Sequence, residues 1–143
     1  SDAVKNSATN LVEKGNLLIV TRTGVGNIAI APFDVAISQD LTGVYLDADQ
    51  ASTSFIFSYF EYYSDALRSL NQGTSIAGIT REVLISAEVI LPSVEEQRAI
   101  ATVLSDMDAE IAALETRRTK TQAIKQGMMQ ELLTGRTRLT INP

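Results

Sequence analysis

The longest regular feature of the chain is encoded by residues 92–134, PSVEEQRAIATVLSDMDAEIAALETRRTKTQAIKQGMMQELLT. Ser93 and Glu96 form the pattern of a capping box, in which each side chain satisfies a backbone N–H of the first helical turn. No proline lies within the stretch after its first residue, and Gly127 is the only interior glycine. We therefore predict one helix from Ser93 to Thr134. At 1.5 Å per residue it would extend about 60 Å, too far to pack along a small module, so we expect it to project.

Apolar side chains recur along this helix with a heptad period, the pattern of a coiled-coil seam. Such a stripe needs a partner helix to cover it, although its first turns could instead fold back on the chain's own domain. Both ends of the seam are apolar and its centre is polar. The seam, which we predict to be a dimer interface, consists of Ile100, Leu104, Met107, Ile111, Leu114, Arg118, Thr121, Lys125, Met128 and Leu132.

Charge divides the same helix into two halves. Acidic residues dominate from Ser93 to Thr116, whereas basic residues dominate from Arg117 onward. An antiparallel pair would set each acidic half against a basic half, and a parallel pair would oppose like charges. Complementing the helix dipole is an alternative explanation, but it reaches only the terminal turns. Because exposed ion pairs select orientation more than they add stability, we predict an antiparallel homodimer with its two-fold axis near Arg118 to Thr121.

The composition excludes several classes of function. The 143 residues contain 12 basic and 17 acidic side chains and neither histidine nor cysteine, for a formal net charge of −5. Disulfide scaffolds, thiolate zinc sites, cysteine nucleophiles and histidine-based triads are therefore excluded. The chain carries no apolar run long enough to span a membrane and does not open with a signal sequence. We therefore expect a soluble, cytoplasmic protein that does not contact a membrane, and the composition disfavours most hydrolytic and redox chemistry.

Residues 1–92 predict a small mixed α+β module, and residues 93–143 predict the long helix with a short tail. Two aliphatic stretches, residues 17–21 and 27–31, have the composition of strands joined by a glycine turn. The other expected elements are strands at 35–37, 44–46 and 89–91, a helix from Ser52 to about Leu70, and a short turn capped by Thr80 that ends at Leu84. Most aromatic residues fall on that helix at helical spacing without interleaved basic residues, which favours core packing over base stacking.

Three stretches of the chain are informative in combination. LPSVEEQRAI at residues 91–100 opens the long helix, IKQGMMQELLTG at residues 124–135 closes it, and GNLLIVTRTGVG at residues 15–26 contains the glycine turn. Together they resemble the specificity subunits of type I restriction–modification systems. The likeness covers most of the chain and is strongest after Leu91.

The resemblance implies a DNA-recognition component without catalytic activity. Specificity subunits of this family carry two target recognition domains, which each read half of a split DNA site, and two conserved helices packed antiparallel. Those helices dock methyltransferase subunits, which hold S-adenosylmethionine, and through them the restriction subunits. This sequence corresponds to part of one target recognition domain, residues 1–92, and one conserved helix. It is therefore either a fragment or a half-subunit that dimerises.

Polar and basic residues in the predicted loops are the candidates for contact with double-stranded DNA. Arg22 could pair with phosphate or guanine, and Gln39 could read a base edge. The alternatives are an ordinary hairpin turn for the first group, polar loops and a helix C-cap for the others, and a surface salt bridge for Arg81. The candidates are Arg22, Thr23, Gly24, Gln39, Asn71, Gln72, Gly73, Thr74, Ser75 and Arg81.

Two apolar residues near the end of the long helix fall off the seam. Met129 and Leu133 are predicted to face the methyltransferase, although packing against the module of a second copy is an alternative. We expect no metal or cofactor on this chain. Because residues 1–92 are acidic, DNA affinity should depend on a partner that wraps the DNA. A coiled-coil scaffold that binds the methyltransferase or itself and reads no sequence is the alternative function.

Overall fold

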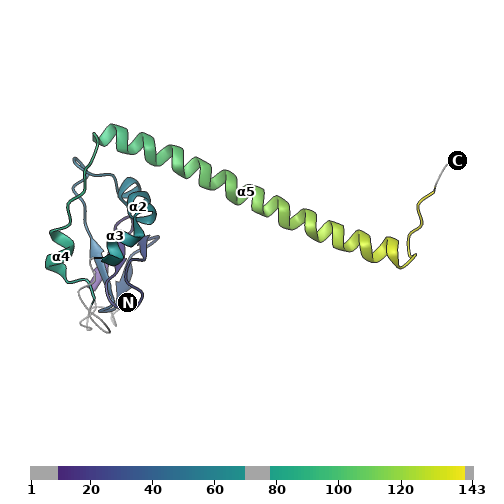
Figure 1. Cartoon of the computed structure of the whole chain (residues 1–143), viewed down its shortest axis with the longest axis horizontal. Coiled ribbons are helices and arrows are strands. Elements are labelled where there is room, and N and C mark those ends of the chain that lie inside the picture. The colour runs from purple at the N-terminus through teal and green to yellow at the C-terminus, as the bar shows by residue number, and fades with distance from the viewer. Residues whose placement is uncertain (1–9, 70–77, 141–143) are drawn as a thin grey trace. The chain divides into compact units, whose positions relative to one another are not determined.

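The computed structural model describes residues 10–69 and 78–140, which form a small α+β module and a long helix (Figure 1). This confirms the predicted fold class. The chain divides into two compact units, Ser1–Thr102 and Val103–Pro143. The long helix, α5 (Val94–Leu133), is continuous through that boundary, so its first turns belong to the module.

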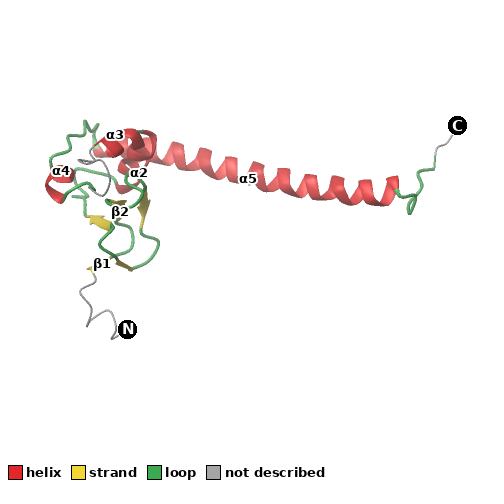
Figure 2. Cartoon of the chain, turned by 60° about the horizontal axis from the view of Figure 1, so that its bottom comes forward, coloured by secondary structure: helices red, strands yellow, loops and turns green. Residues whose placement is uncertain are grey.

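Two small antiparallel sheets form the centre of the module (Figure 2). In the larger sheet, β2 (Leu17–Val20) lies between β3 (Ile28–Ile30) and β5 (Leu41–Val44). In the smaller sheet, β1 (Asn10–Val12) pairs with β4 (Val35–Ile37). The predicted strand pair on either side of the glycine turn is therefore confirmed as β2 and β3, and the strand at 35–37 as β4.

The core lies where the two sheets meet. Leu18 of β2 is 8% exposed and Val12 of β1 is 2% exposed, and both belong to one cluster of buried apolar side chains. Leu18 is opposite Gly43 in the β2–β5 ladder. A Cβ at Gly43 would lie 2.5 Å from Cγ2 of Val12, so the glycine leaves the space that Val12 fills.

Three short helices complete the module: α2 (Thr53–Tyr62), α3 (Ser64–Ser69) and α4 (Arg81–Ile85). α2 packs against β3, and α4 lies on another side of the module in both ribbon views (Figures 1 and 2). The single helix predicted from Ser52 to Leu70 is thus wrong in one respect, because it breaks at Tyr63, whose backbone has φ −95° and ψ 37°. Neither glycine nor proline marks this break in the sequence.

Three further expectations at element boundaries are corrected by the structure. The strand expected at 44–46 begins earlier and ends at Val44, because its pairing with β2 runs from Leu41 to Val44. The segment 89–91 is not a strand and has no strand partner among the described residues. β1 was not expected, since three residues with only Val12 buried are too short to show a period of two.

The ends of α5 follow from local chemistry. The hydroxyl of Ser93 accepts the N–H of Glu96 over 3.3 Å, which confirms one of the two bonds of the expected capping box. The return bond from the Ser93 N–H to the Glu96 carboxylate is not formed within the described residues. Past the other end, Gly135 takes φ +73° and donates its N–H to the carbonyl of Leu132 over 3.2 Å. The observed helix is one residue shorter at each end than the predicted one. None of the helices within residues 10–69 and 78–140 is long and apolar enough to cross a membrane.

Candidate nucleic-acid interface

Thr21, the residue that follows β2, joins three loop segments through its backbone and side chain. Its N–H donates to the carbonyl of Asp40 over 2.8 Å, and its carbonyl accepts the N–H of Ile79 over 2.8 Å. Its hydroxyl lies 3.3 Å from both the Asp40 carbonyl and the Thr42 hydroxyl. Thr21 is 5% exposed, so these bonds satisfy a buried polar residue. Segments far apart in the sequence are therefore held at one point.

The glycine turn between β2 and β3 is the first of these segments. Val20 pairs with Leu41 at the end of the β2–β5 ladder, so this turn and the turn before β5 leave the same end of the sheet. Gly24 and Gly26 have φ of +87° and +96°, a region that favours glycine. Gly26 is also closely covered, since a Cβ there would lie 2.5 Å from Cγ of Arg68. The turn is thus a packed feature of the module and not a loose loop.

Four of the predicted DNA-contact residues lie on these two turns. Arg22, Thr23 and Gly24 occupy the first turn and Gln39 the second, and the side chains or backbones of all of them are exposed. The bond from Thr21 to Asp40 connects the two turns directly. The structure therefore brings together candidates that are well separated in the sequence.

The third segment enters the same neighbourhood at Gly78. A Cβ at Gly78 would overlap the carbonyl oxygen of Thr21 and would lie 3.1 Å from Cγ of Arg22. The backbone of the segment therefore runs directly against the first turn. The predicted contact residues Asn71, Gln72, Gly73, Thr74 and Ser75 fall outside the described residues, and their role stays a prediction.

Arg81 lies beside β1 and β5 and not in the glycine turn. It lines a surface groove together with Leu11, Thr42, Tyr45, Leu84 and Ile85. The ion pairs within residues 10–69 and 78–140 are Arg68–Asp65 and Arg136–Glu131, so neither Arg22 nor Arg81 is paired with a described carboxylate. Both residues are exposed, so an external anion can reach either guanidinium group.

The cap of α4 positions Arg81. The hydroxyl of Thr80 accepts the N–H of Val83 over 3.4 Å, as expected for a helix N-cap. The pKa of the neighbouring Glu82 carboxyl is lowered, first by a hydrogen bond with its own backbone, then by the Thr80 hydroxyl, and less by the charge of Arg81. The side chain of Arg81 therefore belongs to the first turn of a short helix whose N-terminus is capped.

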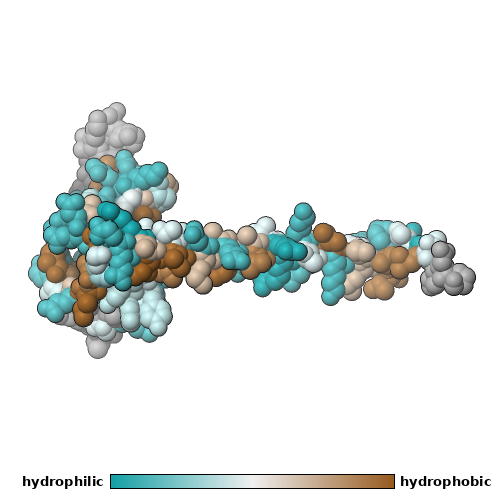
Figure 3. Space-filling view, turned by 90° about the horizontal axis from the view of Figure 1, so that it is seen from above, coloured by the Kyte–Doolittle hydropathy of each residue, from teal (hydrophilic) through white to brown (hydrophobic). Residues whose placement is uncertain are grey.

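The predicted seam of α5 is exposed along the described chain. Ile100 is 36% exposed, Leu104 40%, and Met107, Ile111 and Leu114 all exceed 50%. Apolar surface alternates with polar surface along the helix (Figure 3). Leu132 is half-buried, whereas Arg118, Thr121 and Lys125 are exposed at the polar centre of the seam.

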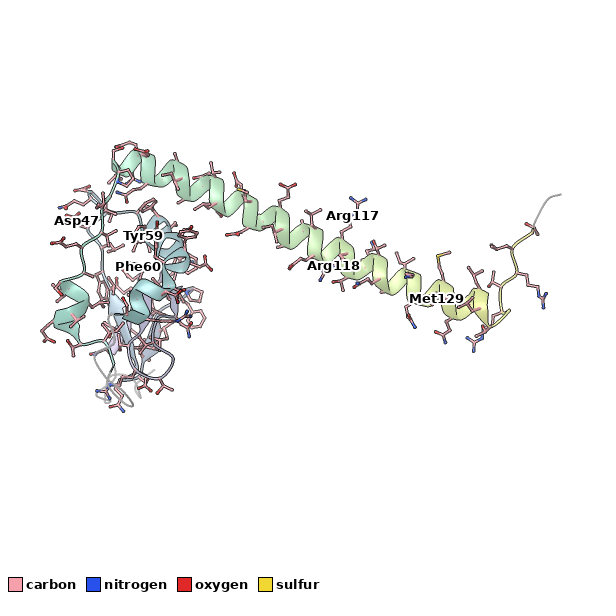
Figure 4. All side chains as sticks on the ribbon, viewed as in Figure 1. Asp47, Tyr59, Phe60, Arg117, Arg118 and Met129 are labelled. Atoms are coloured by element: carbon pink, nitrogen blue, oxygen red, sulfur yellow. The ribbon has the colours of Figure 1, made fainter. Side chains whose placement is uncertain are left out.

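The last turns of α5 carry exposed apolar side chains in addition to those of the seam. Met128, Met129 and Leu133 are 55%, 42% and 77% exposed. They line a shallow apolar groove with Ile124 and Leu132, and Met129 lies near the end of the helix while Arg117 and Arg118 mark its middle (Figure 4). The sequence pattern that singled out Met129 and Leu133 therefore corresponds to exposed apolar side chains.

Gln97, near the start of α5, is a buried residue that the sequence analysis did not single out. Its side chain is 0% exposed. Its Oε1 accepts the N–H of Ser52 over 2.9 Å, and its Nε2 donates to the carbonyls of Gln50 and Pro92 over 3.0 and 2.9 Å. The sequence likewise indicates Thr21 only as the end of a strand. A polar residue flanked by apolar or helical positions was the available signal, but polar residues at such positions are usually exposed.

Comparison with known proteins places these features in a family. Residues 1–126 match the model of the type I restriction modification DNA specificity domain. Over 134 residues the chain is 31% identical to a protein of Methanocaldococcus jannaschii named as the specificity subunit of the type I restriction enzyme MjaX, covering 94% of this chain and 32% of the relative. The MjaIX specificity subunit of the same organism is 29% identical over 108 residues, 74% of this chain and 25% of that protein. The chain thus spans about a third of the length of the first relative.

Solved structures show the same fold. A chain from a study of complex assembly and conformational transition of the type I R-M system superposes with a TM-score of 0.70 at 24% identity, over 87% of this chain and 30% of that one. The HsdS subunit of Thermoanaerobacter tengcongensis gives a TM-score of 0.65 at 22% identity, over 85% and 30% of the two chains. At these identities the likeness concerns the fold alone.

Proposed function

The chain belongs to the family of type I restriction modification DNA specificity domains, and we propose that it reads one half of a split DNA site and positions a methyltransferase on it. One observation carries the proposal. Thr21 holds the glycine turn, the turn before β5 and the segment leading to Arg81 together, and the guanidinium groups of Arg22 and Arg81 have no described carboxylate partner. Two exposed guanidinium groups that lie outside the ion pairs of the described residues suit phosphate and base-edge contacts.

The acidic character of the chain shapes how this recognition would work. With a net charge of −5, the chain lacks the broad basic face that gives autonomous DNA binders their affinity. The proposed division of labour is that the methyltransferase supplies most of the attraction to phosphate. This chain would supply discrimination among sequences, and S-adenosylmethionine would be bound by the methyltransferase.

The seam of α5 supports the second part of the proposal, an antiparallel homodimer. Apolar side chains at Ile100, Leu104 and Met107 would face Met128 and Leu132 of a second copy, and each acidic half would oppose a basic half. All these side chains except half-buried Leu132 are exposed in the single chain. The dimer would carry two recognition modules related by two-fold symmetry, which suits a split and roughly palindromic site.

The experiment that tests the function is site selection with the full chain and its methyltransferase subunit. Methylation of a randomised DNA pool should enrich one split site, and exchanging residues 1–92 for those of a related specificity subunit should change the enriched bases. Random methylation, or an enriched site that is indifferent to the exchange, would contradict sequence reading. It would leave only a scaffold that binds the methyltransferase or itself.

A further inference from the structure

We propose that Gln97 is the positioning residue that sets which spacer length between two half-sites this protein accepts. The inference rests on the proposed function and adds to it a residue that contacts no DNA. Within α5, only Gln97 and Ala101 are buried among the described residues. They mark the face by which the first turns of the helix are fixed to the module.

The amide of Gln97 is held from two directions. The Ser52 N–H donates to its Oε1 from the residue preceding α2, and its Nε2 donates to Gln50 in the same segment and to Pro92 just before α5. No exposed surface remains on the side chain. A rotation or slide of the first turns of α5 would therefore break three buried hydrogen bonds together, and each broken bond would leave a polar group without a partner.

An ordinary apolar core residue would not have this effect. A leucine or methionine fills volume but tolerates small rotations, whereas hydrogen bonds lose strength steeply when their geometry changes. Arg98, the next residue, adds a weaker contact from Nη2 to the carbonyl of Ala48 over 3.4 Å. The segment that includes Asp47, which is labelled in Figure 4, is itself fixed, since Oδ2 of Asp47 accepts the side-chain N–H of Gln50 over 3.1 Å.

A rigid connection between the module and α5, here called the joint, is important for a protein that recognises a split DNA site. In the proposed dimer, the two recognition modules reach their half-sites only if each is held firmly on its helix. Freedom at either joint would let the modules engage half-sites separated by one base pair more or less. The proposed contacts to bases lie elsewhere, at the turns joined by Thr21, so loosening the joint should change spacing tolerance without changing which bases are read.

The test compares the full-length parent, Gln97→Met and Gln122→Met, each with the methyltransferase subunit. Methionine is close to glutamine in volume but makes none of the three bonds, and Gln122 is an exposed residue of the same helix. Methylation is measured on DNA with the selected half-sites held constant and the spacer varied by single base pairs. We expect the parent and Gln122→Met to prefer one spacer at least tenfold over its neighbours, and Gln97→Met to lose that preference while keeping the same half-site bases.

A second measurement is made on the parent and does not depend on whether Gln97→Met folds. In the unmodified parent, the Ser52 N–H should exchange with solvent as slowly as the amides of β2, because it is bonded to a buried amide. An identical spacer profile for Gln97→Met and the parent, or fast exchange of the Ser52 N–H, would overturn the role of Gln97. A parent that selects no site at all would instead contradict the proposed function.

Discussion

The carbonyl of Thr21 and the N–H of Ile79 form a 2.8 Å hydrogen bond that closes the module around residues far apart in the sequence. Because Thr21 also donates to the carbonyl of Asp40, a single buried residue determines where the glycine turn, the turn before β5 and the entry to α4 lie. This arrangement leads to the first prediction.

Replacing Gly78 with alanine should destabilise the module. The new Cβ would overlap the carbonyl oxygen of Thr21, which belongs to the backbone and cannot move aside cheaply. We expect the free energy of unfolding to fall by roughly 1–3 kcal/mol, the usual cost of overpacking. The measurement is urea unfolding followed by tyrosine fluorescence, since all four tyrosines lie in the module. Gly127→Ala is the matched control: nothing lies within 4 Å of its Cβ, so it should not destabilise. Equal stability of Gly78→Ala and the parent would contradict the packing.

Removing Arg22 should weaken binding to the selected DNA site in the complex with methyltransferase. For an arginine that contacts a base, we expect the binding free energy to weaken by about 1–3 kcal/mol. For an arginine that contacts a phosphate, we expect the slope of the logarithm of the binding constant against the logarithm of the salt concentration to fall by about one. Fluorescence anisotropy at several salt concentrations separates the two. Arg81→Ala should behave similarly if both arginines face DNA. Lys14→Ala is the control, because Lys14 is exposed near the opposite end of β2, where its N–H bonds to Asp34. Equal losses of DNA affinity on replacing Lys14 and on replacing Arg22 would indicate non-specific charge effects only.

Reversing Arg117 and Arg118 to glutamate should weaken the homodimer. The reversal lowers the net charge of residues 117–143 from +5 to +1, so across an antiparallel pair the acidic half of the second copy loses most of the attraction. We expect the dissociation constant to rise about tenfold at low salt and less at high salt, where exposed charges are screened. Sedimentation at micromolar concentrations measures the change. In a parallel dimer the reversal would reduce the repulsion between the two basic halves, so an unchanged or lower dissociation constant would argue for that orientation.

Replacing Arg117 and Arg118 with glutamine should weaken association less than reversing them does. The glutamine variant leaves residues 117–143 with a net charge of +3, between the +5 of the parent and the +1 of the reversed chain. Equal weakening by the two variants would show that the substitutions act by disrupting the helix and not through charge. Circular dichroism at each step checks helix content.

Charging the end of α5 should separate this chain from the methyltransferase. Met129→Glu with Leu133→Lys replaces two exposed apolar side chains with charges. We expect co-purification with the methyltransferase subunit to be lost while the dimer persists in sedimentation. Thr116→Glu is the control, because it creates the same spacing of acid and base with Lys120 on another stretch of the helix. Retained co-purification of the double variant would refute docking at this groove.

Local pattern was sufficient for α5 and for the β2–β3 pair. The capping residues Ser93 and Gly135 and the aliphatic stretches on either side of the glycine turn act within a few residues, so their effects are legible in sequence. Sequence patterns did not predict the features that depend on contacts with other segments of the chain. The bounds of β5 follow from its pairing with β2, and the break at Tyr63 has no local signal.

The long capped helix, its heptad seam and charge division, and the family to which the chain belongs can all be inferred from the sequence. These properties depend on spacing along one element, and spacing is preserved whatever the rest of the chain does. The roles of Thr21 and Gln97 depend instead on how the folded chain brings distant segments together. Both are polar residues whose burial is tolerated because backbone groups from distant segments satisfy them, and which segments those are depends on how the whole module packs.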